Sequence, residues 1–137
     1  MKEFFSLLSK IQRNEFSPLY LLSGSESFFI DATLKVLMEK LSDEKSNDFD
    51  LSVFYGKEAK AIQILECAKR YPMLSKHNTV VLKDAQLINT DELDVITSYA
   101  QNPNLQTILI ICYKNKIFDK RKKLFKAIEK NGDVLLA

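Results

Sequence analysis

One continuous apolar stretch decides the fold of this chain: Thr-Ile-Leu-Ile-Ile-Cys-Tyr at residues 107–113. A strand with one solvated face alternates apolar and polar side chains, and this stretch does not alternate. An unbroken apolar run of this length is typical of a strand that is buried on both faces, as in a parallel sheet. Two similar runs, at residues 19–22 and 79–82, indicate further buried strands.

Helical patterns separate these strands. Apolar residues recur at helical spacing in residues 4–11, 30–41, 61–68, 93–100 and 117–128. Two more strands are predicted at residues 49–55, which alternate as a strand near a sheet edge does, and at residues 133–137. Ser25 or Ser27 is expected to cap the second helix, and residues 42–48 to form a loop. Strands that alternate with helices predict a three-layer α/β fold, a parallel sheet of about five strands with helices on both faces.

The composition is that of one globular domain. The chain has 137 residues, of which 46% are hydrophobic and 28% charged, so we expect a single domain over residues 1–137 with one sizeable core. Cys67 and Cys112 show no CxxC spacing and His77 is the one histidine, which excludes a disulfide scaffold and a multi-histidine metal site.

No apolar run approaches the roughly 20 residues of a membrane span, and the N-terminus lacks the features of a signal peptide. We therefore expect a cytoplasmic protein with no membrane partner. Because the chain stops at Ala137, inside or just after a strand that should be buried, we also expect residues beyond it.

The turn after the first predicted strand, Ser23-Gly24-Ser25-Glu26, lies where parallel α/β folds bind ligands. A phosphate-binding loop here reads GxxxxGK[ST], because glycines let backbone N–H groups converge on phosphate and the lysine neutralises its charge. This turn has one glycine and no lysine, and Glu26 would repel phosphate. We expect no cofactor and no catalytic use of ATP; the alternative is a nucleotide-binding enzyme domain with a divergent loop.

Asp84 allows three interpretations. It ends a predicted strand where a Walker B carboxylate would lie, but Ala85 follows in place of the glutamate of hydrolytic enzymes. It also suits the phospho-acceptor of a receiver-like signalling domain, although Ser23 and Gly24 replace the acidic pair of such a site. The third interpretation is a helix cap or a solvated loop carboxylate. The sequence contains no paired carboxylates, nucleophile elbow or metal-ligand spacing, so we expect no catalytic residue.

Basic residues gather between Lys114 and Lys130. This segment carries eight basic and two acidic residues, a net charge of +6 in a chain of net charge +2. Such asymmetry suits a nucleic-acid backbone, and a solvated helix face explains it as well. The residues that would face DNA are Lys120, Arg121, Lys122 and Lys123.

A second segment that bears on partners joins a predicted helix to the strand at 79–82. It places Tyr71, Pro72, Met73 and Leu74 in a row, where a surface loop is expected. Consecutive exposed apolar residues are typical of an anchor for a partner's pocket. The alternative is that Tyr71 and Met73 fold back onto the core.

Three stretches, together about half of the chain, resemble one protein family in order and spacing. They are PLYLLSGSESFFID at 18–31, DFDLSVFYG at 48–56, and AKRYPML at 68–74 followed by TVVLKDA at 79–85. The family they resemble is the N-terminal domain of the delta subunit of bacterial DNA polymerase III, the clamp-opening subunit of the clamp loader.

The resemblance implies a P-loop NTPase-like fold, the first domain of a degenerate AAA+ module, followed in the family by lid and collar domains. It implies a non-catalytic subunit of a DNA-directed DNA polymerase holoenzyme, a nucleotidyltransferase by membership of the complex, without ATP hydrolysis. The implied partners are the beta sliding clamp, whose ring is opened during DNA replication, the gamma/tau and delta prime subunits, and DNA through the assembled complex.

The resemblance also implies a site. The family's clamp contact is an apolar pair at the end of the helix before the third strand, which by position falls on Met73 and Leu74, flanked by Tyr71 and Pro72. The sequence departs from many clamp-binding peptides, because Lys69 stands near the place of their glutamine and Leu74 replaces an aromatic residue.

Overall fold

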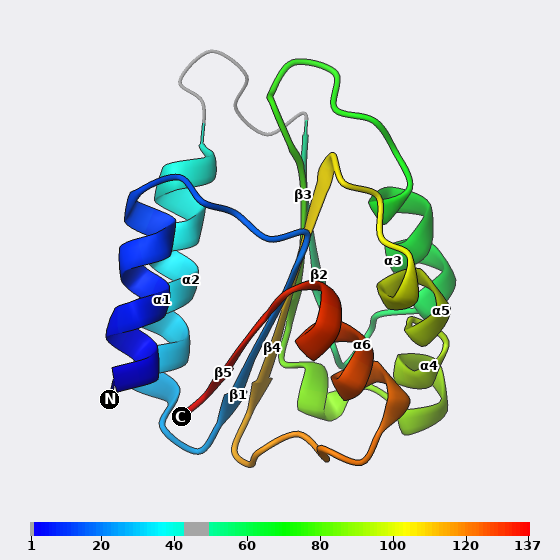
Figure 1. The fold of residues 1–137 in the computed structure, drawn as a ribbon. Coiled ribbons are helices and arrows are strands. Elements are labelled where there is room, and N and C mark those ends of the chain that lie inside the picture. Colours follow the sequence, from blue (N-terminus) through cyan, green and yellow to red (C-terminus); the bar gives the residue numbers. More distant parts are fainter. Residues whose placement is uncertain (1, 43–49) are drawn as a thin grey trace.

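The computed structural model describes residues 2–42 and 50–137 (Figure 1). The helices are α1 (Lys2–Gln12), α2 (Ser27–Leu41), α3 (Ala61–Ala68), α4 (Thr90–Asp94), α5 (Thr97–Gln101) and α6 (Lys123–Asn131), with a 3-10 turn η1 (Ala85–Leu87). The strands are β1 (Leu19–Gly24), β2 (Leu51–Tyr55), β3 (Asn78–Lys83), β4 (Thr107–Lys114) and β5 (Asp133–Leu136). The predicted loop at 42–48, beyond Ser42, and the predicted strand residue Phe49 lie outside the described residues.

The strands form the predicted parallel sheet, in the order β2-β3-β4-β1-β5. The stretch at 107–113 forms most of β4, the central strand, where its side chains from Thr107 to Cys112 are buried. Each strand fits its neighbour in register, so that Leu19 pairs with Leu109 and Thr79 with Ile108. Unbroken apolar sequence is therefore explained by burial on both faces.

Helices cover both faces of the sheet, as predicted (Figure 1). The helices α1 and α2 pack on one face over a core that includes Phe4, Ile30 and Ile110. The helices α3 to α6 pack on the other face over a larger core that includes Ile64, Leu109 and Phe125. Neighbouring residues of β4 thus point into different cores, which follows from the two-residue period of a strand.

Two predicted helices differ in the structure. The helix over 93–100 is split into α4 and α5, because Val95, Ile96 and Thr97 are three consecutive β-branched residues, which disfavour a continuous helix. The helix over 117–128 begins only at Lys123. Asn115 adopts a left-handed conformation, and Phe118 is buried in an irregular segment instead.

Two finer predictions were also wrong. The N-cap of α2 is Glu26, with no side-chain cap bond, rather than Ser25 or Ser27. The strand β2 lies at the sheet edge as predicted, but Val53 and Tyr55 of its expected apolar face are exposed. Phe54, on the opposite face, packs against the larger core instead. On the face of Val53 and Tyr55, Leu51 is the residue that packs against the smaller core.

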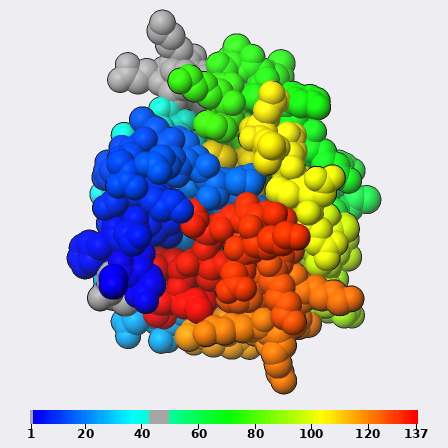
Figure 2. All heavy atoms as spheres, in the orientation of Figure 1, coloured from blue at the N-terminus to red at the C-terminus, as the bar shows by residue number. Residues whose placement is uncertain are grey.

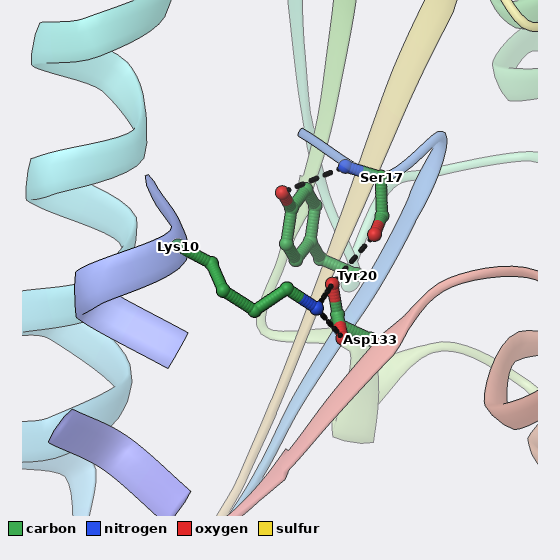
Figure 3. Close-up of polar contacts among 4 residues, drawn as sticks. All are labelled: Lys10, Ser17, Tyr20 and Asp133. Carbon is green, nitrogen blue, oxygen red and sulfur yellow. Dashed lines mark hydrogen bonds and ion pairs between the residues drawn. The ribbon is translucent and has the colours of Figure 1, made fainter. Parts of the chain in front are cut away.

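A polar cluster ties α1 to the last strand (Figure 3). The Lys10 ammonium lies 3.1 and 3.3 Å from the two carboxylate oxygens of Asp133, and the Ser17 hydroxyl donates to that carboxylate at 2.5 Å. The backbone N–H of Ser17 donates to the hydroxyl of buried Tyr20 at 2.9 Å. At Asp133, the cluster joins α1 and the segment before β1 to the edge strand β5, through contacts between residues more than 100 positions apart.

We expect Asp133→Asn to lower the free energy of unfolding by about 1 kcal/mol, because it removes the charge that Lys10 and Ser17 contact. The effect is no larger because solvent screens Lys10, whose side chain is 40% exposed. Urea unfolding followed by circular dichroism measures it. An unchanged free energy of unfolding would show that the cluster adds nothing to the stability of the sheet edge.

Candidate functional site

The sequence-predicted sites lie at opposite ends of the sheet (Figure 1). Because the strands are parallel, the carboxyl ends of β1, β3 and β4 meet at one end, where the turn at 23–26 lies. The loop at 69–77 leads into the amino end of β3 and lies at the other end. The two sites do not form one surface.

The turn at 23–26 is packed against other parts of this chain. The Ser23 hydroxyl accepts a hydrogen bond from the Phe118 N–H at 2.7 Å and donates to the Lys116 carbonyl at 3.2 Å. Gly24 has a φ of +138°, and a Cβ there would lie 1.7 Å from the carbonyl oxygen of Ala137. Glycine is therefore required here by β5 and its continuation, which approach the turn closely, and this accounts for the one glycine that the turn retains.

Asp84 lies beside a small cleft of about 130 Å³, lined also by Asp31, Lys83, Cys112 and Lys114. The Lys114 ammonium pairs with the Asp31 carboxylate at 2.7 Å, and this contact raises the pKa of Lys114. Burial raises the pKa of the Cys112 thiol to about 12, so this cysteine is a poor nucleophile at neutral pH. Asp84 itself occupies the N-cap position of η1 in a left-handed conformation, but its side chain makes no cap hydrogen bond.

The loop at 69–77 exposes its apolar side chains. Met73 is 78% exposed, Tyr71 72% and Leu74 58%, while Pro72 is half-buried. Tyr71 and Met73 therefore do not fold back onto the core. Met73 and Leu74 lie in the loop, beyond the end of α3 at Ala68, rather than on the helix itself. Figure 2 shows the atoms of this loop, in green, at the upper end of the molecule.

One buried carboxylate holds the backbone of this loop. Asp50, which precedes β2 and is only 6% exposed, accepts hydrogen bonds from the N–H groups of Met73, Leu74 and Ser75 at 2.7, 2.7 and 2.6 Å. Burial raises the pKa of Asp50, but these three bonds and the Ser75 side chain outweigh it, so the pKa lies below its ordinary value. The carboxylate is thus ionised at neutral pH, and its bonds are lost only in acid, as the pH falls through this lowered pKa.

A second anchor holds the start of the loop. The side-chain amide of Asn78 donates to the carbonyls of Cys67 at 2.6 Å and Arg70 at 3.2 Å. The Thr107 hydroxyl donates to the Ala68 carbonyl at 2.7 Å, so β4 also contacts the end of α3. The exposed side chains are therefore carried on a backbone that is fixed at both ends.

Sequence patterns did not reveal these anchors. Asp50 and Asn78 lie at the beginnings of the strands predicted at 49–55 and 79–82, where a polar residue usually indicates only a strand boundary. Leu105 was missed too: it is an exposed apolar residue in the neighbouring loop, next to Asn104, whose side chain donates to the Arg70 carbonyl at 3.4 Å. The signal available in the sequence was that the polar residue Asp50 precedes the apolar residues at 71–74 and the polar residue Asn78 follows them.

Comparison with known proteins identifies the family. The family model described as DNA polymerase III, delta subunit, matches residues 20–137. The chain belongs to this family. It is 25% identical, over 97% of its length, to the DNA polymerase III subunit delta of Bacillus subtilis. It superimposes on the solved Bacillus subtilis DNA clamp loader delta protein with a TM-score of 0.85, at 26% identity over 98% of this chain.

More distant structures share the fold alone. A gamma subunit-related protein of DNA polymerase III from Thermotoga maritima matches with a TM-score of 0.65 at 11% identity, covering 98% of this chain and 45% of that one. The RuvB branch migration motor of Thermotoga maritima matches with a TM-score of 0.55 at 13% identity, covering 99% and 43%. These structures share the predicted α/β fold, a five-stranded parallel sheet with helices on both faces. This delta-family chain spans 41% of the curated Bacillus relative and 42% of the solved one.

The four basic residues predicted to face DNA, at 120–123, lie between the end of β4 and the first residue of α6, at the carboxyl ends of the strands and away from the loop at 69–77 (Figure 1). Arg121 pairs with Asp119, and Lys122 lies 3.4 Å from Asp94. Lys120 and Lys123 are exposed, with no ion pair to another described residue. In residues 2–42 and 50–137, no cluster of three or more metal-ligating side chains is found, and no described helix is long and apolar enough to cross a membrane.

Proposed function

We propose that this delta-family chain is a non-catalytic clamp-loader domain that binds the beta sliding clamp and opens its ring. The carrying observation is the loop that presents Tyr71, Met73 and Leu74 to solvent on an anchored backbone, with Pro72 between them. Soluble domains rarely expose consecutive large apolar side chains unless a partner covers them. The family membership and the match to a clamp loader delta protein support this choice of partner.

Opening a ring requires more than binding to it. Full burial of Met73 and Leu74 contributes roughly 1.5 to 3 kcal/mol each, and the flexible methionine adapts to a pocket of imperfect shape. A ligand shifts a conformational equilibrium only by its difference in affinity for the two states. In this proposal the loop therefore binds a clamp with a distorted interface more tightly than a closed one.

The turn at 23–26 supports a role without ATP hydrolysis. It has no lysine to neutralise phosphate, and Ser23 and Gly24 are already packed against Phe118 and Ala137. In this proposal the gamma/tau and delta prime subunits control access to the clamp, DNA is reached through the assembled complex, and the protein works in the cytoplasm as a subunit of the polymerase holoenzyme.

Calorimetric titration of the chain into the beta clamp tests the proposal, with a parallel titration of magnesium-ATP. We expect saturable binding of the clamp and no heat from nucleotide. Binding of magnesium-ATP without clamp binding would favour the nucleotide-binding enzyme. Labelling by a small phosphodonor that is lost in Asp84→Asn would favour the receiver-like signalling domain.

A second contact, with DNA, is proposed for Lys120, Arg121, Lys122 and Lys123. The supporting observation is that Lys120 and Lys123 are exposed and unpaired among the described residues. We expect Lys120→Glu/Lys123→Glu to weaken binding of the assembled loader to primed DNA. The slope of the logarithm of the binding constant against the logarithm of the salt concentration should become shallower by about two, because each phosphate contact contributes about 0.9 to that slope. Fluorescence anisotropy over a range of salt concentrations measures it.

The matched control is Lys57→Glu/Lys60→Glu, which makes the same charge change at two exposed lysines next to α3. An equal loss of DNA affinity in both double variants would show that only net charge matters. Unchanged DNA affinity in both double variants would show that residues 120–123 do not contact DNA.

A further inference from the structure

Two of the three hydrogen bonds to Asp50 come from Met73 and Leu74, the residues that are proposed to bind the clamp. Met73, Leu74 and Ser75 are consecutive, and all three N–H groups converge on one carboxylate. Consecutive backbone N–H groups that converge in this way form an anion-binding nest. Here the anion is supplied by the chain itself, from a residue 23 positions before Met73.

Asp50 is itself held in place. Its backbone carbonyl accepts the Thr79 N–H at 2.7 Å, which joins it to the beginning of β3. Its carboxylate is buried beneath the loop, where hydrogen bonds to a charged acceptor are stronger than neutral ones. The side chain therefore links a rigid strand to a segment that has no helix or strand of its own.

The exposed side chains explain why such a link is needed. Met73 and Leu74 are turned to solvent, so core packing does not fix their backbone. An unanchored loop would sample many conformations and lose that freedom on binding. If only a fraction of the chains held the binding conformation, the apparent dissociation constant would rise by the inverse of that fraction.

We propose that Asp50 is a positioning residue, whose carboxylate fixes the backbone of residues 73–75 so that Met73 and Leu74 are presented to the clamp before it arrives. This inference rests on the proposed function, because it assigns Asp50 a role in that same site. The residue touches no partner in this scheme. It acts through the conformation of the loop.

The test is Asp50→Asn, which keeps the size of the side chain but removes its charge and one acceptor oxygen. We expect affinity for the beta clamp to fall about 10-fold to 100-fold, as for a competent fraction reduced to about 10% or 1%. The fall should lie mainly in the association rate constant, measured by surface plasmon resonance. Amide hydrogen exchange of Met73, Leu74 and Ser75, measured by NMR without clamp, should accelerate.

The matched control is Asp31→Asn, the same chemical change at a carboxylate that pairs with Lys114 at the opposite end of the sheet. It should lower stability while leaving clamp affinity and the exchange of residues 73–75 unchanged. A purely structural role for Asp50 predicts that Asp50→Asn behaves in the same way, and that result would overturn the proposal. Unprotected amides at residues 73–75 in the unsubstituted chain would also overturn it, even if Asp50→Asn failed to fold.

The two proposals fail in different ways. If the unsubstituted chain does not bind the clamp, the proposed function fails, and the exchange measurement still reports whether Asp50 holds the loop. If the chain binds and Asp50→Asn binds equally well, only the role of Asp50 is rejected.

Discussion

Met73→Ala/Leu74→Ala is expected to weaken binding of the beta clamp by roughly 30-fold to several hundred-fold. The two side chains are 78% and 58% exposed, so about two thirds of their surface is still available for burial by a partner. At roughly 1.5 to 3 kcal/mol for each fully buried side chain, that share corresponds to about 2 to 4 kcal/mol. Each 1.4 kcal/mol changes an affinity about tenfold. Isothermal titration calorimetry measures the change directly.

The fold should be unaffected by this double substitution, since neither side chain belongs to the core. Leu87→Ala is the matched control, because Leu87 is also 58% exposed but lies in η1, at the carboxyl end of β3. It should bind the clamp as the unsubstituted chain does. Equal affinity of the double variant and the unsubstituted chain, with both folded by circular dichroism, would contradict the assignment of the loop.

Ile110→Ala is expected to cause the largest loss of stability, about 2 to 5 kcal/mol in the free energy of unfolding. Ile110 is fully buried in the central strand β4, on the face covered by α1 and α2. Truncation removes buried apolar surface and leaves a cavity, because both the sheet and the helices resist collapse. Urea denaturation with a linear extrapolation measures the difference.

Ile62→Ala provides the comparison, since Ile62 lies on α3 and is 66% exposed. Its effect should stay within about 0.5 kcal/mol, as for most surface substitutions. A similar loss in both variants would mean that the face of β4 under α1 and α2 is not a tightly packed core.

Much of the architecture could be predicted because buried strands appear in the sequence as unbroken apolar runs and helices as apolar residues at helical spacing. The runs at 107–113, 19–22 and 79–82 identified three buried strands, which the sheet places side by side with the first of them at its centre. Helix boundaries were less certain, because local preference competes with packing. The split between α4 and α5 and the late start of α6 depend on β-branched residues and on Phe118, which packs into the core outside a helix.

The composition of the candidate site was also accessible from the sequence. The apolar residues from Tyr71 to Leu74 and the turn at 23–26 without its lysine were both visible as residue types. Strand order was not, because it is set by pairings between segments far apart in the chain. The placement of the two sites at opposite ends follows once the strands are parallel, since the turn at 23–26 follows β1 and the loop at 69–77 precedes β3.

By itself, then, the sequence determined which segments form strands, which turn lacks the means to hold phosphate, and which loop is rich in apolar residues. The tertiary structure alone decided that this loop faces solvent and that its backbone is fixed by Asp50 and Asn78. The reason is physical. Apolar periodicity reports local burial, whereas a hydrogen bond between Asp50 and a residue 23 positions away depends on how β2 and β3 pair.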